Sequence, residues 1–214
     1  INMTSCISDP YIVSSYKSHN EMNSNNINDI YIDEEKRIWI ANYPEGITII
    51  DNRYKSYNWI KHSIGNRQSL VNDQVHSVIE DSDGDLWFGT SNGISLYQSK
   101  TGQWHSFLSS FDHQLKNKNH IFITLCEVSP GIIWAGGYTS GVYKINKRTL
   151  SVEYFSPYLL NPDNIRPDKY IRDIVKDSKG YIWSGGFYNL KCFDLSLNSV
   201  RLYPGINSVT AITE

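Results

Sequence analysis

The sequence predicts an all-β protein, and three observations support this fold class. First, residues 75–97 form a cassette of three short β-branched and aromatic runs, joined by turns at Asp83-Gly84 and Asn92-Gly93. Second, the cassette recurs about every 48 residues around Trp39, Trp87, Trp134 and Trp183. Third, an apolar residue stands nine positions before each tryptophan: Ile30, Val78, Leu125 and Ile174. A period of about 40 to 50 residues with four strands per unit is typical of a β-propeller, in which each repeat forms one blade.

The repeat divides the chain into four complete blades and two partial ones. Complete four-stranded blades are predicted at residues 25–72, 73–119, 120–167 and 168–205. Residues 1–24 are predicted to end a preceding blade, and residues 206–214 to begin the first strand of a further blade. The two ends together hold no Trp-bearing strand, so they do not complete a fifth blade of the same kind. Four blades could close on themselves, but the spare strands favour a fragment of a larger propeller.

Residues that recur in every repeat are predicted to be structural. Each blade must pack on its neighbour, and a tryptophan in the middle of a strand suits that role. The glycines are predicted to supply turns with positive φ. The predicted structural anchors are Trp39, Trp87, Trp134, Trp183, Gly84, Gly93, Gly131, Gly141 and Gly180.

Composition and charge exclude several classes of protein. The chain has 214 residues, of which 40% are hydrophobic, so it can build a sizeable core. Its net charge of −2 argues against a nucleic-acid or anionic-membrane surface. No apolar run approaches the roughly 20 residues that span a bilayer, and no signal peptide is evident at the start. Cys6, Cys126 and Cys192 lack metal-ligand spacing and are interpreted as small hydrophobic residues.

Two motifs resemble functional sites, but the pattern around them favours turns. Residues 89–93 (Gly-Thr-Ser-Asn-Gly) fit the nucleophile elbow of serine hydrolases, yet a strand rather than a helix follows. Asp81, Asp83 and Asp85 resemble a calcium loop, but Gly84 stands at the fourth loop position instead of the sixth, and the twelfth position is Asn92 instead of glutamate. The six histidines show no metal-site spacing. No catalytic residue, metal site or cofactor is therefore predicted.

Ligand binding is expected where the repeats differ. The turn after the Trp strand carries Tyr43 in the first repeat, Ser91 in the second, Tyr138 in the third, and Phe187 with Tyr188 in the fourth. Sugars stack on aromatic rings while nearby amides and carboxylates take their hydroxyl groups. We therefore predict a ligand site at Tyr43, Tyr138, Phe187 and Tyr188, with polar groups from Asn28, Asn72, Asp73 and Gln74. The alternative is that these rings only cover blade edges.

The cassette resembles the two-component regulator propeller repeat of hybrid sensor kinases. The resemblance rests on residues 78–94, with Asp81, the Gly84 turn, Leu86-Trp87, Gly89-Thr90 and Asn92-Gly93 in order. It implies a periplasmic sensor region of a membrane-anchored histidine kinase of the Bacteroides type, many of which sense oligosaccharides. It also implies, as partners, further blades and downstream signalling domains of the same chain, with a homodimer as an option and no nucleic acid.

The sequence therefore favours a non-catalytic sensor domain that binds an oligosaccharide or another small molecule. A second hypothesis is a propeller enzyme, such as a polysaccharide lyase or a streptogramin lyase, which would need a convergent histidine or carboxylate pair near the channel. A third is a protein-interaction scaffold. Depletion of a ligand by the isolated protein would indicate an enzyme, whereas reversible binding would indicate a sensor.

Overall fold

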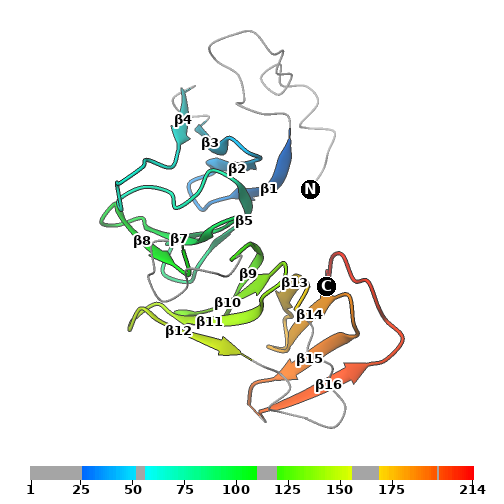
Figure 1. Ribbon diagram of the computed structural model, residues 1–214. Coiled ribbons are helices and arrows are strands. Elements are labelled where there is room, and N and C mark those ends of the chain that lie inside the picture. The colour runs from blue at the N-terminus through cyan, green and yellow to red at the C-terminus, as the bar shows by residue number, and fades with distance from the viewer. Residues whose placement is uncertain (1–25, 52–55, 110–119, 156–168, 197) are drawn as a thin grey trace.

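The computed structural model describes residues 26–51, 56–109, 120–155, 169–196 and 198–214. In these residues the chain forms four antiparallel sheets of four strands each and no helix (Figure 1). The predicted all-β propeller fold is confirmed. Among the described residues, no helix has the length and apolar character needed to span a membrane.

Each sheet is a meander in which consecutive strands pair. The first contains β1 (Ile27–Ile32), β2 (Ile38–Asn42), β3 (Gly46–Asp51) and β4 (Ser56–Ile60). The second contains β5 (Val75–Glu80), β6 (Leu86–Thr90), β7 (Gly93–Gln98) and β8 (Gln103–Phe107). The third contains β9 (Phe122–Ser129), β10 (Ile132–Gly137), β11 (Gly141–Asn146) and β12 (Ser151–Phe155). The fourth contains β13 (Ile171–Lys176), β14 (Ile182–Gly186), β15 (Leu190–Asp194) and β16 (Ser199–Tyr203).

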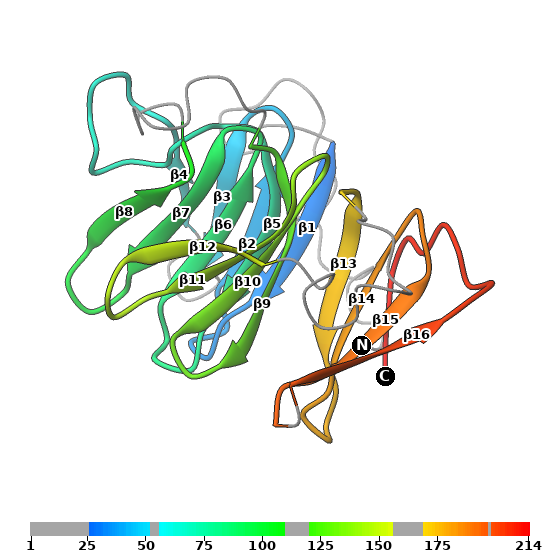
Figure 2. The same cartoon turned by 60° about the horizontal axis from the view of Figure 1, so that its bottom comes forward.

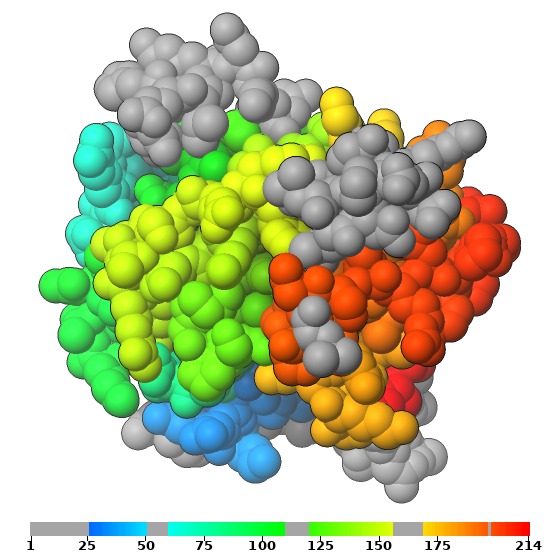
Figure 3. Space-filling model, turned by 90° about the horizontal axis from the view of Figure 1, so that it is seen from below, coloured from blue at the N-terminus to red at the C-terminus, as the bar shows by residue number. Residues whose placement is uncertain are grey.

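The sheets follow one another around a common axis as blades do. The first strands of neighbouring sheets contact each other, β1 with β5, β5 with β9, and β9 with β13, so these strands lie innermost. The fourth strands β4, β8, β12 and β16 lie on the outside (Figures 1 and 2). The third and fourth sheets appear side by side in the space-filling view of Figure 3, in yellow-green and orange to red.

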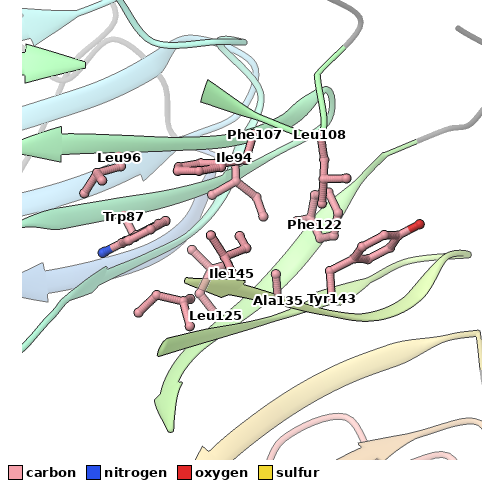
Figure 4. Packing of buried hydrophobic residues seen from close by; sticks show 11 residues of the cluster. Trp87, Ile94, Leu96, Phe107, Leu108, Phe122, Leu125, Ala135, Tyr143 and Ile145 are labelled. Carbon is pink, nitrogen blue, oxygen red and sulfur yellow. The ribbon is translucent and has the colours of Figure 1, made fainter. Parts of the chain in front are cut away.

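The core lies between blades, and each anchor tryptophan packs across that boundary. Trp39 of the first sheet clusters with Val75 and Phe88 of the second. Trp87 of the second sheet clusters with Leu125, Ala135 and Ile145 of the third (Figure 4). Trp134 of the third sheet lies edge-to-face against Phe193 of the fourth, with ring centroids 5.2 Å apart. The three indole rings are at most 3% exposed, as blade-to-blade packing requires.

The acid six residues before the tryptophan holds its indole. Asp33, Asp81 and Asp177 each accept a hydrogen bond from the indole Nε1–H of their own repeat, at 2.9, 2.8 and 2.8 Å. Burying an indole N–H without an acceptor would be unfavourable, and the carboxylate removes this penalty. The third repeat has Val128 instead, which is buried in the cluster around Trp134.

The predicted turn glycines adopt left-handed backbone conformations. Gly93 has a φ of +100°, and a Cβ atom there would lie 2.6 Å from the carbonyl oxygen of Phe107. A side chain at this position would be strained and would clash, which explains a glycine there. The other predicted turn glycines also have positive φ: Gly84, Gly131, Gly141 and Gly180. In the fourth repeat Asn189 takes this conformation, with a φ of +49°.

Residues 206–214 lie against the fourth sheet through contacts that recur between the sheets. The backbone N–H of Ile212 donates to Asp173 Oδ2 at 2.6 Å, as that of Val78 donates to Asp29 Oδ2 at 2.8 Å. Glu214 accepts hydrogen bonds from Ser178, as Glu127 does from Ser82. The assignment of these residues to a further blade, like the other blade boundaries, stays a prediction, and residues 1–24 lie outside the described residues.

Candidate functional site

Each innermost strand carries a β-bulge near its first residue. In all four sheets the register with the second strand shifts by one position, so one residue of the innermost strand has no partner. The extra residues are Asn28, His76, Ile123 and Arg172. A bulge re-aims the side chain that it carries and is over-represented beside binding sites. The repeats thus keep the bulge and vary the residue in it, which makes the bulge residues candidates for ligand contact.

The bulges lie at the same end of the sheets as the turns predicted to bind ligand. Tyr43 N donates to Asn26 O at 2.9 Å, Ser91 N to Gln74 O at 2.9 Å, and Tyr138 N to Ile121 O at 2.8 Å. These hydrogen bonds join each turn to the segment that enters the innermost strand of its own sheet. We call this end the mouth, defined by the four bulge residues and the turn residues Tyr43, Ser91, Tyr138 and Phe187.

The structure brings two of the predicted ligand residues together through a third ring. Tyr138 and Tyr170 meet edge-to-face with centroids 5.1 Å apart, and Tyr170 and Phe187 do so at 4.7 Å. We call these three rings the aromatic row. Tyr138 is 41% exposed and Phe187 is 43% exposed, so both rings present area to solvent. Tyr188 follows Phe187 and is also exposed. Binding of a ligand by these residues stays a prediction.

Tyr43 contacts a different partner. Its ring lies 6.0 Å from the imidazole of His76, at an interplanar angle of 33°. His76 Nε2 is 2.8 Å from Ser91 Oγ, and His76 Nδ1 is 3.4 Å from Asn28 Nδ2. Burial lowers the pKa of His76 below its usual value, which favours the neutral imidazole. The mouth therefore has a second polar cluster beside Tyr43.

Sequence reasoning missed Tyr170 and His76. Tyr170 stands four residues before Ile174, in the segment where the second repeat has Gln74 and the third has Ile121. A comparison of this entry position across the repeats would have identified Tyr170 as a departure. His76 was treated only as one of six histidines, although it occupies the bulge position that differs in every repeat.

Two of the four predicted polar groups hold the entry loop. Asn72 Oδ1 accepts the backbone N–H of Gln74 at 2.9 Å, and Asp73 Oδ1 accepts that of His62 at 2.6 Å. Asn28 Nδ2 donates to the carbonyl oxygen of Val75 at 2.8 Å and also faces His76. Asn28 is therefore the predicted polar residue that the structure places within the mouth cluster.

Carboxylates on the innermost strands connect the blades. Asp29 Oδ2 and Asp173 Oδ2 each accept a backbone N–H from the next innermost segment, and Thr124 Oγ1 accepts that of Ile174 at 3.2 Å. Burial is the main cause that raises the pKa of Asp29, and the charge of Asp173 adds to it. These hydrogen bonds assign the carboxylates a role in aligning adjacent blades.

The acidic turn that resembles a calcium loop is occupied by an ammonium group. Lys147 Nζ of the third sheet lies 2.6 Å from Asp81, 2.9 Å from Asp83 and 2.8 Å from Asp85 of the second, in each case from Oδ2. Burial opposes the charge of Lys147, but the three carboxylates outweigh it and hold its pKa above the usual value. No group of three or more metal-ligating side chains is arranged to hold a metal in the described part of the chain.

A groove of about 840 Å³ runs along the free face of the fourth sheet, from Tyr181 at one end to Asn189 near the mouth. It is lined by Trp183, Tyr181, Tyr203 and Cys192 among others, and the rings of Trp183 and Tyr203 are 5.5 Å apart. This face corresponds to the one on which Trp39, Trp87 and Trp134 pack against a following sheet, and no described sheet covers it. Trp183 is therefore only partly buried, unlike the other three anchors. Because it is a blade-packing face, we do not assign the ligand to it.

Comparison with known proteins agrees with the repeat pattern. Residues 21–43 and 69–92 match the family model described as two component regulator propeller. Two segments of the chain thus match the repeat of this family. The second matched segment contains most of the cassette around Trp87, including the bulge residue His76 and the turn residue Ser91 of the mouth.

Solved structures with the same fold include two Bacteroides proteins. The chain resembles the extracellular domain of a protein described as a putative hybrid two component system from B. thetaiotaomicron, with a TM-score of 0.72 and 21% identity over 89% of this chain and 25% of that one. A second extracellular domain from B. thetaiotaomicron is described as belonging to a putative one component system. It gives a TM-score of 0.67 at 21% identity, over 92% of this chain and 26% of that one. The chain thus spans about a quarter of the length of these structures.

A lyase shares the fold as well. Virginiamycin B lyase from Staphylococcus aureus gives a TM-score of 0.63 at 15% identity, over 84% of this chain and 55% of that one. At these identities each likeness shows the fold alone. No curated protein sequence matches the chain significantly.

Proposed function

We propose that this chain is part of a non-catalytic, extracytoplasmic sensor domain of a hybrid two-component histidine kinase. Its ligand is a carbohydrate-derived molecule, most simply an oligosaccharide, and its output reaches transcriptional control through signalling domains of the same protein. The proposed location is the periplasm. Support comes from the regulator-propeller match and from the two extracellular domains that share the fold.

The single observation that supports a carbohydrate ligand is the aromatic row. Tyr138, Tyr170 and Phe187 come from two sheets and meet edge-to-face at the mouth, with two of the rings more than 40% exposed. An exposed aromatic surface beside polar bulge residues suits the apolar C–H face and the hydroxyl rim of a sugar. Arg172, the bulge residue of the fourth sheet, is exposed at the same end.

A lyase is the alternative that one neighbour favours. Eliminative cleavage needs a base placed at a substrate proton. On the innermost strands the carboxylates Asp29 and Asp173 accept backbone N–H groups from the next innermost segment. His76 lies at the mouth, and its contacts with Asn28 and Ser91 favour a role in binding.

Titration calorimetry with a panel of oligosaccharides tests the proposal. One member of the panel should bind reversibly, with no product detected after prolonged incubation, and Tyr170→Ala should weaken it. Tyr181→Ala is the matched control, because Tyr181 is 39% exposed and lies in the turn between β13 and β14, at the opposite end of the sheet. Consumption of the oligosaccharide would contradict a sensor. Equal affinity for Tyr170→Ala and wild type would remove the aromatic row from the site.

A further inference from the structure

In the polar cluster beside Tyr43, a histidine contacts a serine through one ring nitrogen and an asparagine amide through the other. Asn28 comes from the bulge of β1, His76 from the bulge of β5, and Ser91 from the turn after β6. The cluster thus joins two blades at the mouth. Ser91 also stands where the other repeats place an aromatic residue. Both features mark the cluster as a departure from the repeated structure.

The hydrogen-bond network favours one position for the proton of the His76 imidazole. Asn28 Nδ2 donates to the carbonyl oxygen of Val75 at 2.8 Å, which orients the amide so that its nitrogen also faces His76 Nδ1. An N–H group facing Nδ1 requires Nδ1 to accept, so the proton of the neutral ring is on Nε2. Nε2–H then donates to Ser91 Oγ at 2.8 Å. The hydroxyl proton of Ser91 consequently points away from His76.

This tautomer is wrong for a serine nucleophile. In a catalytic triad the third group accepts the Nδ1 proton, so that Nε2 is unprotonated and removes the serine proton. Here Asn28 presents a donor to Nδ1, and Nε2 is itself a donor. The backbone agrees, because β7 follows Ser91 where a nucleophile elbow requires a helix. The cluster is arranged to present a hydroxyl group and not to activate it.

We propose that Asn28, His76 and Ser91 form a hydroxyl-recognition subsite for an uncharged sugar ring that lies against Tyr43. The Ser91 hydroxyl donates to a sugar oxygen, and Asn28 Oδ1, which its amide orientation leaves available, accepts a sugar hydroxyl. A sugar hydroxyl group is both donor and acceptor, so it suits such a pair. His76 is a positioning residue, because it acts through Ser91. This inference rests on the proposed carbohydrate ligand and names the chemistry of one part of its site.

The proton position is measurable without any ligand. Nitrogen NMR of the imidazole in the free protein should find His76 neutral near pH 7 with its proton on Nε2. A covalent test accompanies it, in which a fluorophosphonate probe should leave Ser91 unlabelled. A proton on Nδ1 would overturn the subsite, because Nε2 would then accept the hydroxyl proton of Ser91. Labelling of Ser91 that His76→Phe abolishes would also overturn it, because that result identifies a nucleophile.

Binding is measured with neutral maltohexaose, xylohexaose and mannohexaose, together with acidic hexagalacturonate. At least one neutral hexaose should bind, and Ser91→Ala should weaken it about 5-fold, the loss expected of one neutral hydrogen bond. His76→Phe should weaken it by a similar factor, and the double variant by no more than either alone, because the two residues act as one unit. Ser91→Thr, which keeps the hydroxyl group, should restore most of the affinity.

Ser99→Ala is the control, since its hydroxyl donates to Gly84 O in turns at the opposite end of the second sheet. Thermal midpoints establish that all variants are folded. If a neutral hexaose binds and Ser91→Ala binds it equally well, the subsite is wrong and the proposed function survives. If only hexagalacturonate binds, the uncharged ligand is wrong. If no saccharide binds the folded wild type, the proposed function fails and the subsite fails with it.

Discussion

At the scale of single residues, the positions that recur in every repeat and the positions that vary have different roles. The anchor tryptophans are buried between blades, and in three repeats an aspartate accepts the indole proton. The bulge residues differ in every repeat and lie at the mouth. Stability should therefore respond to the first set and ligand binding to the second.

Replacement of Trp87 by alanine should lower the free energy of unfolding by about 3–5 kcal/mol, the usual loss for a buried aromatic ring. Trp87 is fully buried between the second and third sheets. Trp183→Ala is the matched control and should lose clearly less, because that ring is only partly covered. Urea denaturation measures both, and equal losses would contradict the packing difference.

His76 should make stability depend on pH in the mildly acidic range. Its pKa is lowered by burial, so the unfolded chain binds the proton more readily than the folded one. The contribution is complete above the usual histidine pKa of about 6.5, and it is lost as pH falls from there through the folded pKa. His76→Gln should flatten the stability curve in this window. Parallel curves for wild type and variant from pH 7 to 5 would disprove the assignment.

At the scale of elements, adjacent blades are joined by polar contacts as well as by apolar packing. The clearest is the ion cluster of Lys147 with Asp81, Asp83 and Asp85, which links the turn after β11 to the turn between β5 and β6. Both the ammonium and Asp81 are nearly inaccessible to water. Removing one charge of a buried cluster leaves the others uncompensated, which makes the cluster sensitive to substitution.

Lys147→Ala should destabilise the protein by about 3–5 kcal/mol, the range for removal of one partner of a buried ion pair. Lys144→Ala, three residues earlier on β11, should change stability by less than about 0.5 kcal/mol. Thermal unfolding of the two variants beside wild type gives the comparison. If the losses are equal, Lys147 serves only as a surface lysine.

At the scale of the whole molecule, the sequence was sufficient to predict the repeated blades. It was insufficient to predict which polar and aromatic side chains meet between blades. The period around Trp39, Trp87, Trp134 and Trp183 predicted four antiparallel sheets, because one blade's requirements recur in the next. Lys147 and Asp83 are 64 residues apart, and no local pattern connects them. Tyr138 and Phe187 were predicted as ligand residues, but the contact that joins them through Tyr170 was not. The partial exposure of Trp183 likewise depends on whether another sheet covers its face, and no described sheet does.

Hydrogen exchange of the chain with and without a bound oligosaccharide tests the central claim most directly, because it maps the ligand onto the propeller without substitutions. The account predicts slower exchange at the mouth, around Asn28, Tyr43, His76, Ser91 and Tyr138. It predicts no change in the turns at the opposite end, at residues 81–85 and 177–181, or along the groove beside Trp183. Protection confined to those turns or to the groove would contradict the assignment of the ligand site to the mouth.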